Sequence, residues 1–171
     1  MKKFMVVLIL VVCTACSENI IKGQITIQNN KLVVTVQNTT DDILEIKEKK
    51  SKQIISCLFK NDTSIFLLDN ENYDITTSKT NNFKKYEDYD RDLLINTSKS
   101  KVEIKYTKQD NKTVNGECII YAYSNNKIID VVKYDVSFND NNIYTCKYSS
   151  NFKFDDIKII ERMWTKNNKG V

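Results

Sequence analysis

Residues 132–138 read Val-Lys-Tyr-Asp-Val-Ser-Phe, and this stretch decides the fold class. Its apolar side chains occupy every second position, with Lys133, Asp135 and Ser137 between them. Successive side chains of a β-strand point to opposite faces. The period of two therefore predicts a strand with one face on a core and with Lys133, Asp135 and Ser137 facing water. Residues 139–142 then predict a hairpin loop.

The chain on both sides of this stretch repeats the strand character. Alternating or continuous apolar segments occur at 25–27, 32–36, 43–46, 54–59, 65–68, 102–106, 118–123 and 144–148. Residues 54–59 carry apolar side chains on both faces, which predicts a central strand. Residues 152–164 fit a helix face as well as a strand, and the β-branched residues at 157–160 favour the strand.

Asparagine supplies the turns between these segments. The chain contains no proline and only three glycines, whereas Asn pairs stand at 29–30, 81–82, 125–126 and 141–142. Asn tolerates left-handed backbone and its side chain can replace a turn hydrogen bond. We therefore predict an all-β protein, an antiparallel β-sandwich that forms a single domain over residues 24–171.

Residues 69–92 are the most polar and least periodic part of the chain. We predict a long surface connection here, with a strand at 73–77 and one helical turn at 83–89. The helical turn rests on the i,i+3 spacing of Phe83 and Tyr86.

Residues 34–44 read Val-Thr-Val-Gln-Asn-Thr-Thr-Asp-Asp-Ile-Leu. This run resembles the second-strand signature of many bacterial immunoglobulin-like sandwich domains, in which an acidic turn follows alternating valines. The resemblance covers about fifteen residues and implies an immunoglobulin-like topology. The antibody hallmark of a tryptophan in the third strand is missing, because the only tryptophan is Trp164.

The first sixteen residues have the organisation of an export signal. Lys2 and Lys3 precede an apolar run at 4–12, which is far shorter than the roughly 20 apolar residues that span a bilayer. Thr14-Ala15-Cys16 follows. The segment resembles a bacterial lipoprotein signal, in which small residues precede a cysteine that becomes the first mature residue. Cys13 stands where that family usually has an aliphatic residue.

The resemblance implies a signal peptide at 1–15, a lipidated Cys16 and a tether at 16–23. Ser17, in place of the aspartate that retains such proteins at the inner membrane, implies the outer membrane, with the domain in the periplasm or at the cell surface. The alternative is an ordinary secretory signal cleaved after Ala15, with no lipid.

Composition argues against several function classes. The chain has no histidine, the commonest general base and metal ligand. Its net charge is +4, and its lysines alternate with acids instead of forming a stripe, which does not favour nucleic-acid binding. We therefore expect no catalytic residues, no cofactor and no metal, and we expect the protein not to be an enzyme.

Two motifs fall short of known chemistry. Asp88, Asp90 and Asp92 have the spacing of the first calcium ligands of an EF-hand loop, but Leu93 and Lys99 occupy its glycine and bidentate glutamate positions. A solvated acidic loop is the better interpretation. Residues 98–101 match Ser-x-x-Lys of penicillin-interactive enzymes, yet they lie between two apolar runs and predict a turn.

Cysteine and tyrosine leave alternatives open. In an oxidising envelope Cys118 and Cys146, which we place in neighbouring strands, can form a disulfide, whereas all three of Cys57, Cys118 and Cys146 can equally be small buried hydrophobes. The tyrosines of the second half form either an outward binding face or, as strand composition favours, core and cross-strand pairs.

These observations give two hypotheses for function. The first is an envelope lipoprotein whose non-catalytic sandwich binds a protein or an envelope polymer, with the membrane as partner through its lipid. The second is an inhibitor or immunity-type lipoprotein that neutralises a toxin, lytic enzyme or phage function, with residues 69–92 as its inhibitory loop.

Overall fold

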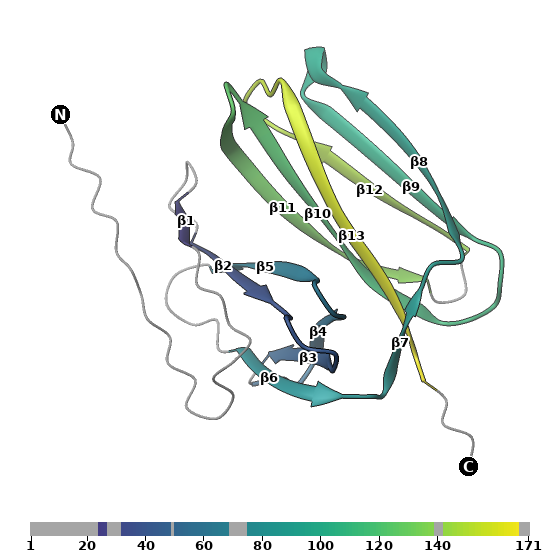
Figure 1. Ribbon diagram of the computed structural model, residues 1–171. Helices are drawn as coiled ribbons and strands as arrows, with labels where there is room; N and C mark the ends of the chain where they lie inside the picture. Colours follow the sequence, from purple (N-terminus) through teal and green to yellow (C-terminus); the bar gives the residue numbers. More distant parts are fainter. Residues whose placement is uncertain (1–23, 27–31, 49, 69–74, 139–141, 168–171) are drawn as a thin grey trace.

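The computed structural model describes residues 24–26, 32–48, 50–68, 75–138 and 142–167 (Figure 1). The predicted signal at 1–15, Cys16 and the tether at 16–23 lie outside the described residues. The strands are β1 (Gln24–Thr26), β2 (Leu32–Gln37), β3 (Ile43–Glu48), β4 (Ile54–Leu58), β5 (Thr63–Leu68), β6 (Ile75–Thr80), β7 (Phe83–Tyr86), β8 (Tyr89–Asn96), β9 (Lys101–Lys108), β10 (Val114–Ser124), β11 (Lys127–Phe138), β12 (Ile143–Ser149) and β13 (Asp156–Lys166).

These strands form antiparallel sheets that face one another in two pairs (Figure 1). The N-terminal pair consists of sheets β1-β2-β5 and β4-β3-β6, and its core contains Val36, Leu44, Ile46 and Leu58. The C-terminal pair consists of sheets β11-β10-β13-β7 and β12-β9-β8, and side chains from both sheets form its larger core. The predicted all-β antiparallel sandwich class is confirmed, with two facing pairs of sheets where one was expected.

Strands β10 and β13 form the centre of the C-terminal pair. β10 pairs with β11 on one side and with β13 on the other, so that Cys118 lies opposite both Tyr134 and Glu161. The strand predicted within 152–164 is confirmed. Asn125 and Asn126 connect β10 to β11 with φ angles of 50° and 60°, the left-handed backbone that asparagine tolerates.

Within the predicted surface connection at 69–92, the strand expected at 73–77 is confirmed over its described residues by β6, whereas the prediction is wrong for the other described residues. In its described part, β6, β7 and the start of β8 are strands, and the helical turn at 83–89 is absent. Phe83 and Tyr86 are both buried because they point to opposite faces of β7. Phe83 packs beside Trp164, while Tyr86 enters the core of the C-terminal pair. Their i,i+3 spacing therefore reflects two buried faces of a strand.

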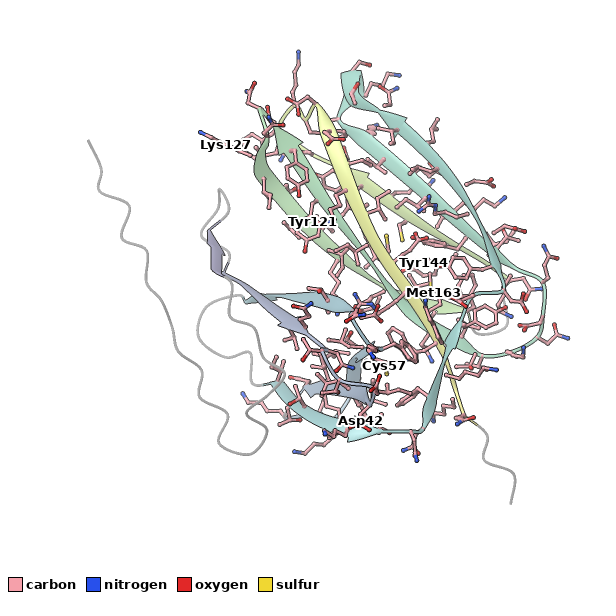
Figure 2. All side chains as sticks on the ribbon, viewed as in Figure 1. Asp42, Cys57, Tyr121, Lys127, Tyr144 and Met163 are labelled. Atoms are coloured by element: carbon pink, nitrogen blue, oxygen red, sulfur yellow. The ribbon has the colours of Figure 1, made fainter. Side chains whose placement is uncertain are left out.

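Strand β4 also has two buried faces, although it is not central. It is an edge strand of the sheet β4-β3-β6, contrary to the prediction for residues 54–59. Leu58 packs in the N-terminal core, whereas Cys57 packs with Phe83 and Trp164. Figure 2 shows Cys57 where the N-terminal sheets meet the lower end of β13. We call this region the junction.

The junction also holds a buried cluster of charges, and the prediction that Lys133 faces water is wrong. Glu117 is fully buried, and its carboxylate lies 2.8 Å from Arg162 Nη1 and 2.8 Å from Lys133 Nζ. The Ser64 hydroxyl donates to Glu117 at 3.0 Å, and Lys133 donates to the Ile55 carbonyl at 3.0 Å. The N-terminal sheets cover the outer face of β10 and β11. The polar side chains on that face are therefore buried.

Candidate functional site between strands β8 and β13

One side of the C-terminal sheet pair is closed by tyrosines. The Tyr134 hydroxyl donates to the Lys147 carbonyl at 2.8 Å, and the Tyr144 hydroxyl donates to the Asp135 carbonyl at 2.8 Å. These bonds join β11 of one sheet to β12 of the other. The residues Tyr86, Tyr106, Tyr121 and Tyr148 are buried. The tyrosines thus serve mainly as core and cross-strand residues, as strand composition favoured.

The opposite side, between β8 and β13, is open. Within the described chain β8 pairs only with β9, and β13 pairs with β7 only over residues 163–166. Residues 156–162 of β13 therefore have β10 on one side and no described strand on the other. Two edges with unpaired backbone groups lie on the same side of the sandwich.

Strand β8 carries three consecutive apolar residues at this open side. Leu93 and Ile95 lie opposite the core residues Ile104 and Val102 of β9, so they occupy the core-facing side of their strand. They are nevertheless 39% and 44% exposed, and Leu94 on the outer face is 67% exposed. No described strand of the facing sheet extends over them. The result is an exposed apolar strip, Leu93 to Ile95, on an edge strand.

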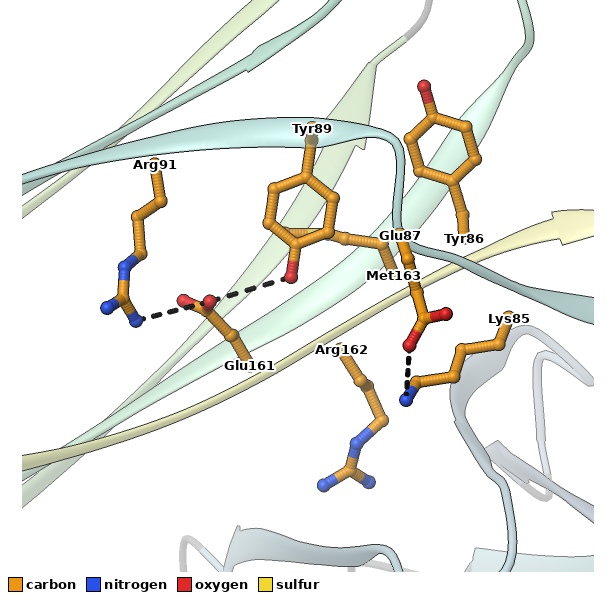
Figure 3. A pocket seen from close by; sticks show the side chains of 8 residues that line it. All are labelled: Lys85, Tyr86, Glu87, Tyr89, Arg91, Glu161, Arg162 and Met163. Carbon is orange, nitrogen blue, oxygen red and sulfur yellow. Dashed lines mark hydrogen bonds and ion pairs between the residues drawn. The ribbon is translucent and has the colours of Figure 1, made fainter.

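A pocket of about 380 Å³ lies at the lower end of this open side, between β7, β8 and β13. Its lining residues are Lys85, Tyr86, Glu87, Tyr89, Arg91, Glu161, Arg162 and Met163 (Figure 3). In the close view Arg91 and Tyr89 point toward Glu161, while Arg162 points away from it. Arg162 belongs to the other face of β13, where it enters the junction.

Glu161 is the centre of the polar contacts in the pocket. It follows Ile157 and Ile159 on the core-facing side of β13, where a carboxylate needs partners. Tyr106 donates to it at 2.9 Å, Arg91 lies 3.2 Å away and Tyr89 donates at 3.5 Å. Burial, together with the charge of Glu161, raises the pKa of Tyr89 to about 12. The Tyr89 hydroxyl therefore stays protonated and available as a donor.

A second ion pair lines the mouth of the pocket. Lys85 and Glu87 lie 2.8 Å apart (Figure 3). Their hydrogen bond raises the pKa of Lys85 and lowers the pKa of Glu87. Lys112 stands over the Tyr86 ring, 5.7 Å from its centroid. The pocket thus offers fixed charges and hydroxyl groups at the end of an apolar strip, an arrangement suited to binding.

The structure places the predicted cysteines in contact, although not in neighbouring strands. Cys118 lies on β10 and Cys146 on β12, which belong to different sheets and face each other across the core. Both are buried free thiols of the same core cluster. Cys57 is a third buried free thiol, at the junction.

The two rejected motifs have simple structural roles. Of the acidic residues at 88–92, Asp88 lies in the connection between β7 and β8, whereas Asp90 and Asp92 lie in β8; all three are exposed to solvent. Among the described residues no group of three His, Cys, Asp or Glu side chains is placed to hold a metal ion. Residues 98–101 form the predicted turn, in which a 3₁₀ segment, Thr97–Lys99, ends at Ser100 with a φ of 51°.

The sequence contains a signal for Glu161, although this residue was not among the predicted site residues. In the run Ile157, Ile159, Glu161, Met163 a carboxylate occupies an apolar position of the alternation. A charge at such a position indicates a buried or half-buried partner. The partner Arg91 lies 70 residues earlier in the chain. No local pattern identifies it.

Comparison with family models, with curated proteins and with solved structures found no match to this chain. The described residues also contain no helix with the length and apolarity that a membrane crossing would need.

Proposed function

We propose that this protein is an envelope lipoprotein whose sandwich binds an extended segment of a partner protein along the open side between β8 and β13. The observation that supports this best is the exposed apolar strip, Leu93 to Ile95, on an edge strand beside the pocket. Soluble proteins usually protect such edges with charges, proline or a covering segment. An apolar edge is a template on which a partner strand can add.

Both kinds of recognition that strand addition requires are present at this side. The free backbone edges of β8 and of residues 156–162 supply main-chain hydrogen bonds, which are independent of sequence. Leu93 and Ile95 supply apolar contacts to alternate side chains of the added strand. The Arg91–Glu161 pair in the pocket would face polar groups near one end of that segment. An envelope polymer would use the pocket but not the backbone edges.

The anchor is proposed from the first sixteen residues. Lipidation of Cys16 would attach two or three acyl chains, and at about 0.8 kcal/mol per buried methylene two chains already make release negligible. Ser17 favours the outer membrane. Residues 34–44 support an immunoglobulin-like origin for the sandwich. We propose a binding role and no catalysis, because the pocket charges are paired with one another.

The inhibitor or immunity-type function is the alternative, and the structure changes which residues would carry it. The predicted inhibitory loop at 69–92 includes the strands β6 and β7 and the start of β8. Among the described strands of this region, β8 carries the exposed apolar edge that would make an inhibitory contact. The partner would then be a foreign enzyme or toxin instead of a resident protein.

A photo-cross-linking residue at position 94 tests the binding surface in living cells. We expect Leu94 variants to form a discrete covalent adduct with one envelope protein. The matched control is position 143, because Ile143 is 51% exposed on β12, the other edge of the same sheet. An adduct that appears only after a lytic enzyme or toxin is added would support the inhibitor. Equal labelling at both positions, or none at 94, would refute this surface.

Substitution of Cys16 tests the anchor separately. Cys16→Ala should leave an unprocessed precursor or a soluble domain, whereas Cys13→Ala should be processed normally because that residue is discarded with the signal. Fractionation of the envelope and mass spectrometry of the mature N-terminus give the answer. A Cys16→Ala protein that is still cleaved and still remains in the outer membrane after a high-salt wash would contradict the proposal.

A further inference from the structure

The two sheets of the C-terminal pair meet at a pair of thiols. Cys118 of β10 and Cys146 of β12 belong to the same core cluster and are both essentially inaccessible to solvent. They come from different sheets, and Tyr134, which lies opposite Cys118, donates to the carbonyl of Lys147, the residue after Cys146. A disulfide requires two cysteines that approach closely, and this packing brings β10 and β12 together at Cys118 and Cys146.

The third cysteine does not compete for this pairing. Cys57 lies in the junction, packed with Phe83 and Trp164, on the outer side of β13. The burial of its thiol, reinforced by the carboxylates of Glu45 and Glu117, raises its pKa strongly. Cys57 is therefore protonated and unreactive while the protein is folded. Of the three core cysteines, two therefore face each other, and the third is a structural thiol.

The two thiols of the pair are chemically different. Cys118 accepts a hydrogen bond from Cys146, and the Tyr106 hydroxyl provides a second contact. These contacts lower the pKa of Cys118 despite its burial, while the same hydrogen bond raises the pKa of Cys146. Tyr106 also donates a hydrogen bond to Glu161, so only this side chain separates the two thiols from the pocket.

We propose that Cys118 and Cys146 form a disulfide that links the two sheets of the C-terminal pair when the chain folds in an oxidising compartment. The thiolate of one of these cysteines attacks a sulfur of an external disulfide, such as oxidised glutathione or a disulfide exchange protein, and one thiol of that oxidant leaves. The other cysteine loses its proton and attacks the first in the mixed disulfide, which releases the second thiol. The protein loses two electrons and two protons, and the oxidant becomes two thiols.

Because both thiols are buried in the folded protein, the exchange takes place while the sheets are still apart. The bond then closes a loop between residues 118 and 146 and restricts the unfolded chain. This proposal depends on the proposed envelope location only because an oxidising compartment would supply the external disulfide. The chemistry can therefore be tested without a membrane.

The test refolds the full chain, with Cys13→Ser and Cys16→Ser, in a buffer of reduced and oxidised glutathione. Alkylation under denaturing conditions, followed by peptide mass spectrometry without reductant, identifies the free and linked cysteines. We expect a cross-linked peptide pair containing Cys118 and Cys146, and a single alkylated residue, Cys57. Reduction should lower the Tm by about 5–10 °C, as expected for a disulfide in a chain of this size.

Matched variants separate the bond from general effects of reductant. Cys57→Ser should keep both the cross-link and the Tm shift, whereas Cys146→Ser should lose both. Three alkylated cysteines in the refolded protein, or a cross-link that includes Cys57, would overturn the proposal. Either result would leave the lipid anchor and the β8 surface untouched, because neither depends on this bond.

Discussion

Gly116 of β10 lies opposite Met163 of β13, with little space for a side chain. A Cβ atom added at this position would lie 2.2 Å from the Met163 sulfur and 2.5 Å from the Arg162 carbonyl oxygen. The sulfur belongs to a flexible side chain and can move, but the carbonyl is backbone and takes part in the pairing of β10 with β13. Gly116→Ala therefore forces the two central strands apart.

We expect Gly116→Ala to lower the free energy of unfolding by about 1–3 kcal/mol, the usual cost of overpacking a core. Urea denaturation followed by circular dichroism measures this directly. Asn115→Ala, at the adjacent and more exposed position of the same strand, is the control and should change the value by less than about 0.5 kcal/mol. A Gly116→Ala midpoint equal to that of the unmodified protein would show that the strands separate without cost.

At the scale of elements, three strands of one sheet, β10, β11 and β13, carry a buried charge cluster that contacts the N-terminal sheets through hydrogen bonds. Glu117 of β10 neutralises Lys133 of β11 and Arg162 of β13, and it accepts a hydrogen bond from Ser64 of β5. Removing one partner of a buried ion pair leaves the other charge uncompensated, at a cost of about 3–5 kcal/mol. Glu117→Ala leaves the two cations with only their longer contacts, Arg162 to Asp62 at 3.8 Å and Lys133 to Asp135 at 4.0 Å.

We therefore expect Glu117→Ala to destabilise the protein by at least that amount, with loss of the contact between the sheet pairs. Limited proteolysis and thermal denaturation should both report it. Glu103→Ala removes a carboxylate that lies 3.8 Å from Lys147 on the exposed face of β9, and its effect should stay within about 1 kcal/mol. Similar losses from the two substitutions would mean that burial does not matter here.

The elements predicted correctly are those whose environment is local to the chain. Strand β9 has one face on the core and one in solvent. Its apolar residues Val102, Ile104 and Tyr106 therefore alternate with polar ones, and neighbouring residues in the sequence are enough to predict the strand. Lys133 alternates in the same way, yet the N-terminal sheets cover it. Lys133 contacts residues about 80 positions earlier, and the alternation of side chains along one strand cannot predict such a contact.

The same limit explains the missed site. Phe83 and Tyr86 suggested a helix because two separate cores bury the two faces of one short strand. Glu161 could have been suspected from its apolar position, but not its partners Arg91 and Tyr106, which come from the other sheet. Local periodicity therefore predicts strands well and the packing between sheets poorly.

For the whole molecule, the buried tyrosines make stability depend on alkaline pH. Burial raises the pKa to about 12 at Tyr86, Tyr89, Tyr121, Tyr134 and Tyr148. In the unfolded chain tyrosine ionises near pH 10. Between about pH 10 and pH 12 the unfolded state therefore binds fewer protons than the folded state, so stability falls as pH rises through this window and is fully present below it.

Ultraviolet titration of tyrosinate, recorded together with circular dichroism, measures this. We expect these tyrosines to remain protonated above pH 10 and to ionise with the loss of β-structure. A sample unfolded in guanidinium should ionise near pH 10 in a single step. Ionisation of all tyrosines near pH 10 with intact β-structure would show that their hydroxyls are freely hydrated.

The central place of β13 has a consequence for the order in which the protein can be completed. Its residues come after all the other strands in the chain, yet they lie between β10 and β7 and reach down to Trp164 in the junction. Until they emerge from the ribosome, β10 keeps one edge unpaired and Arg162 is missing from the charge cluster. The C-terminal sheet pair therefore cannot reach its final state before the last strand is made, because it depends on contacts of long sequence separation. Synthesis of the final strand is thus the step that closes the molecule.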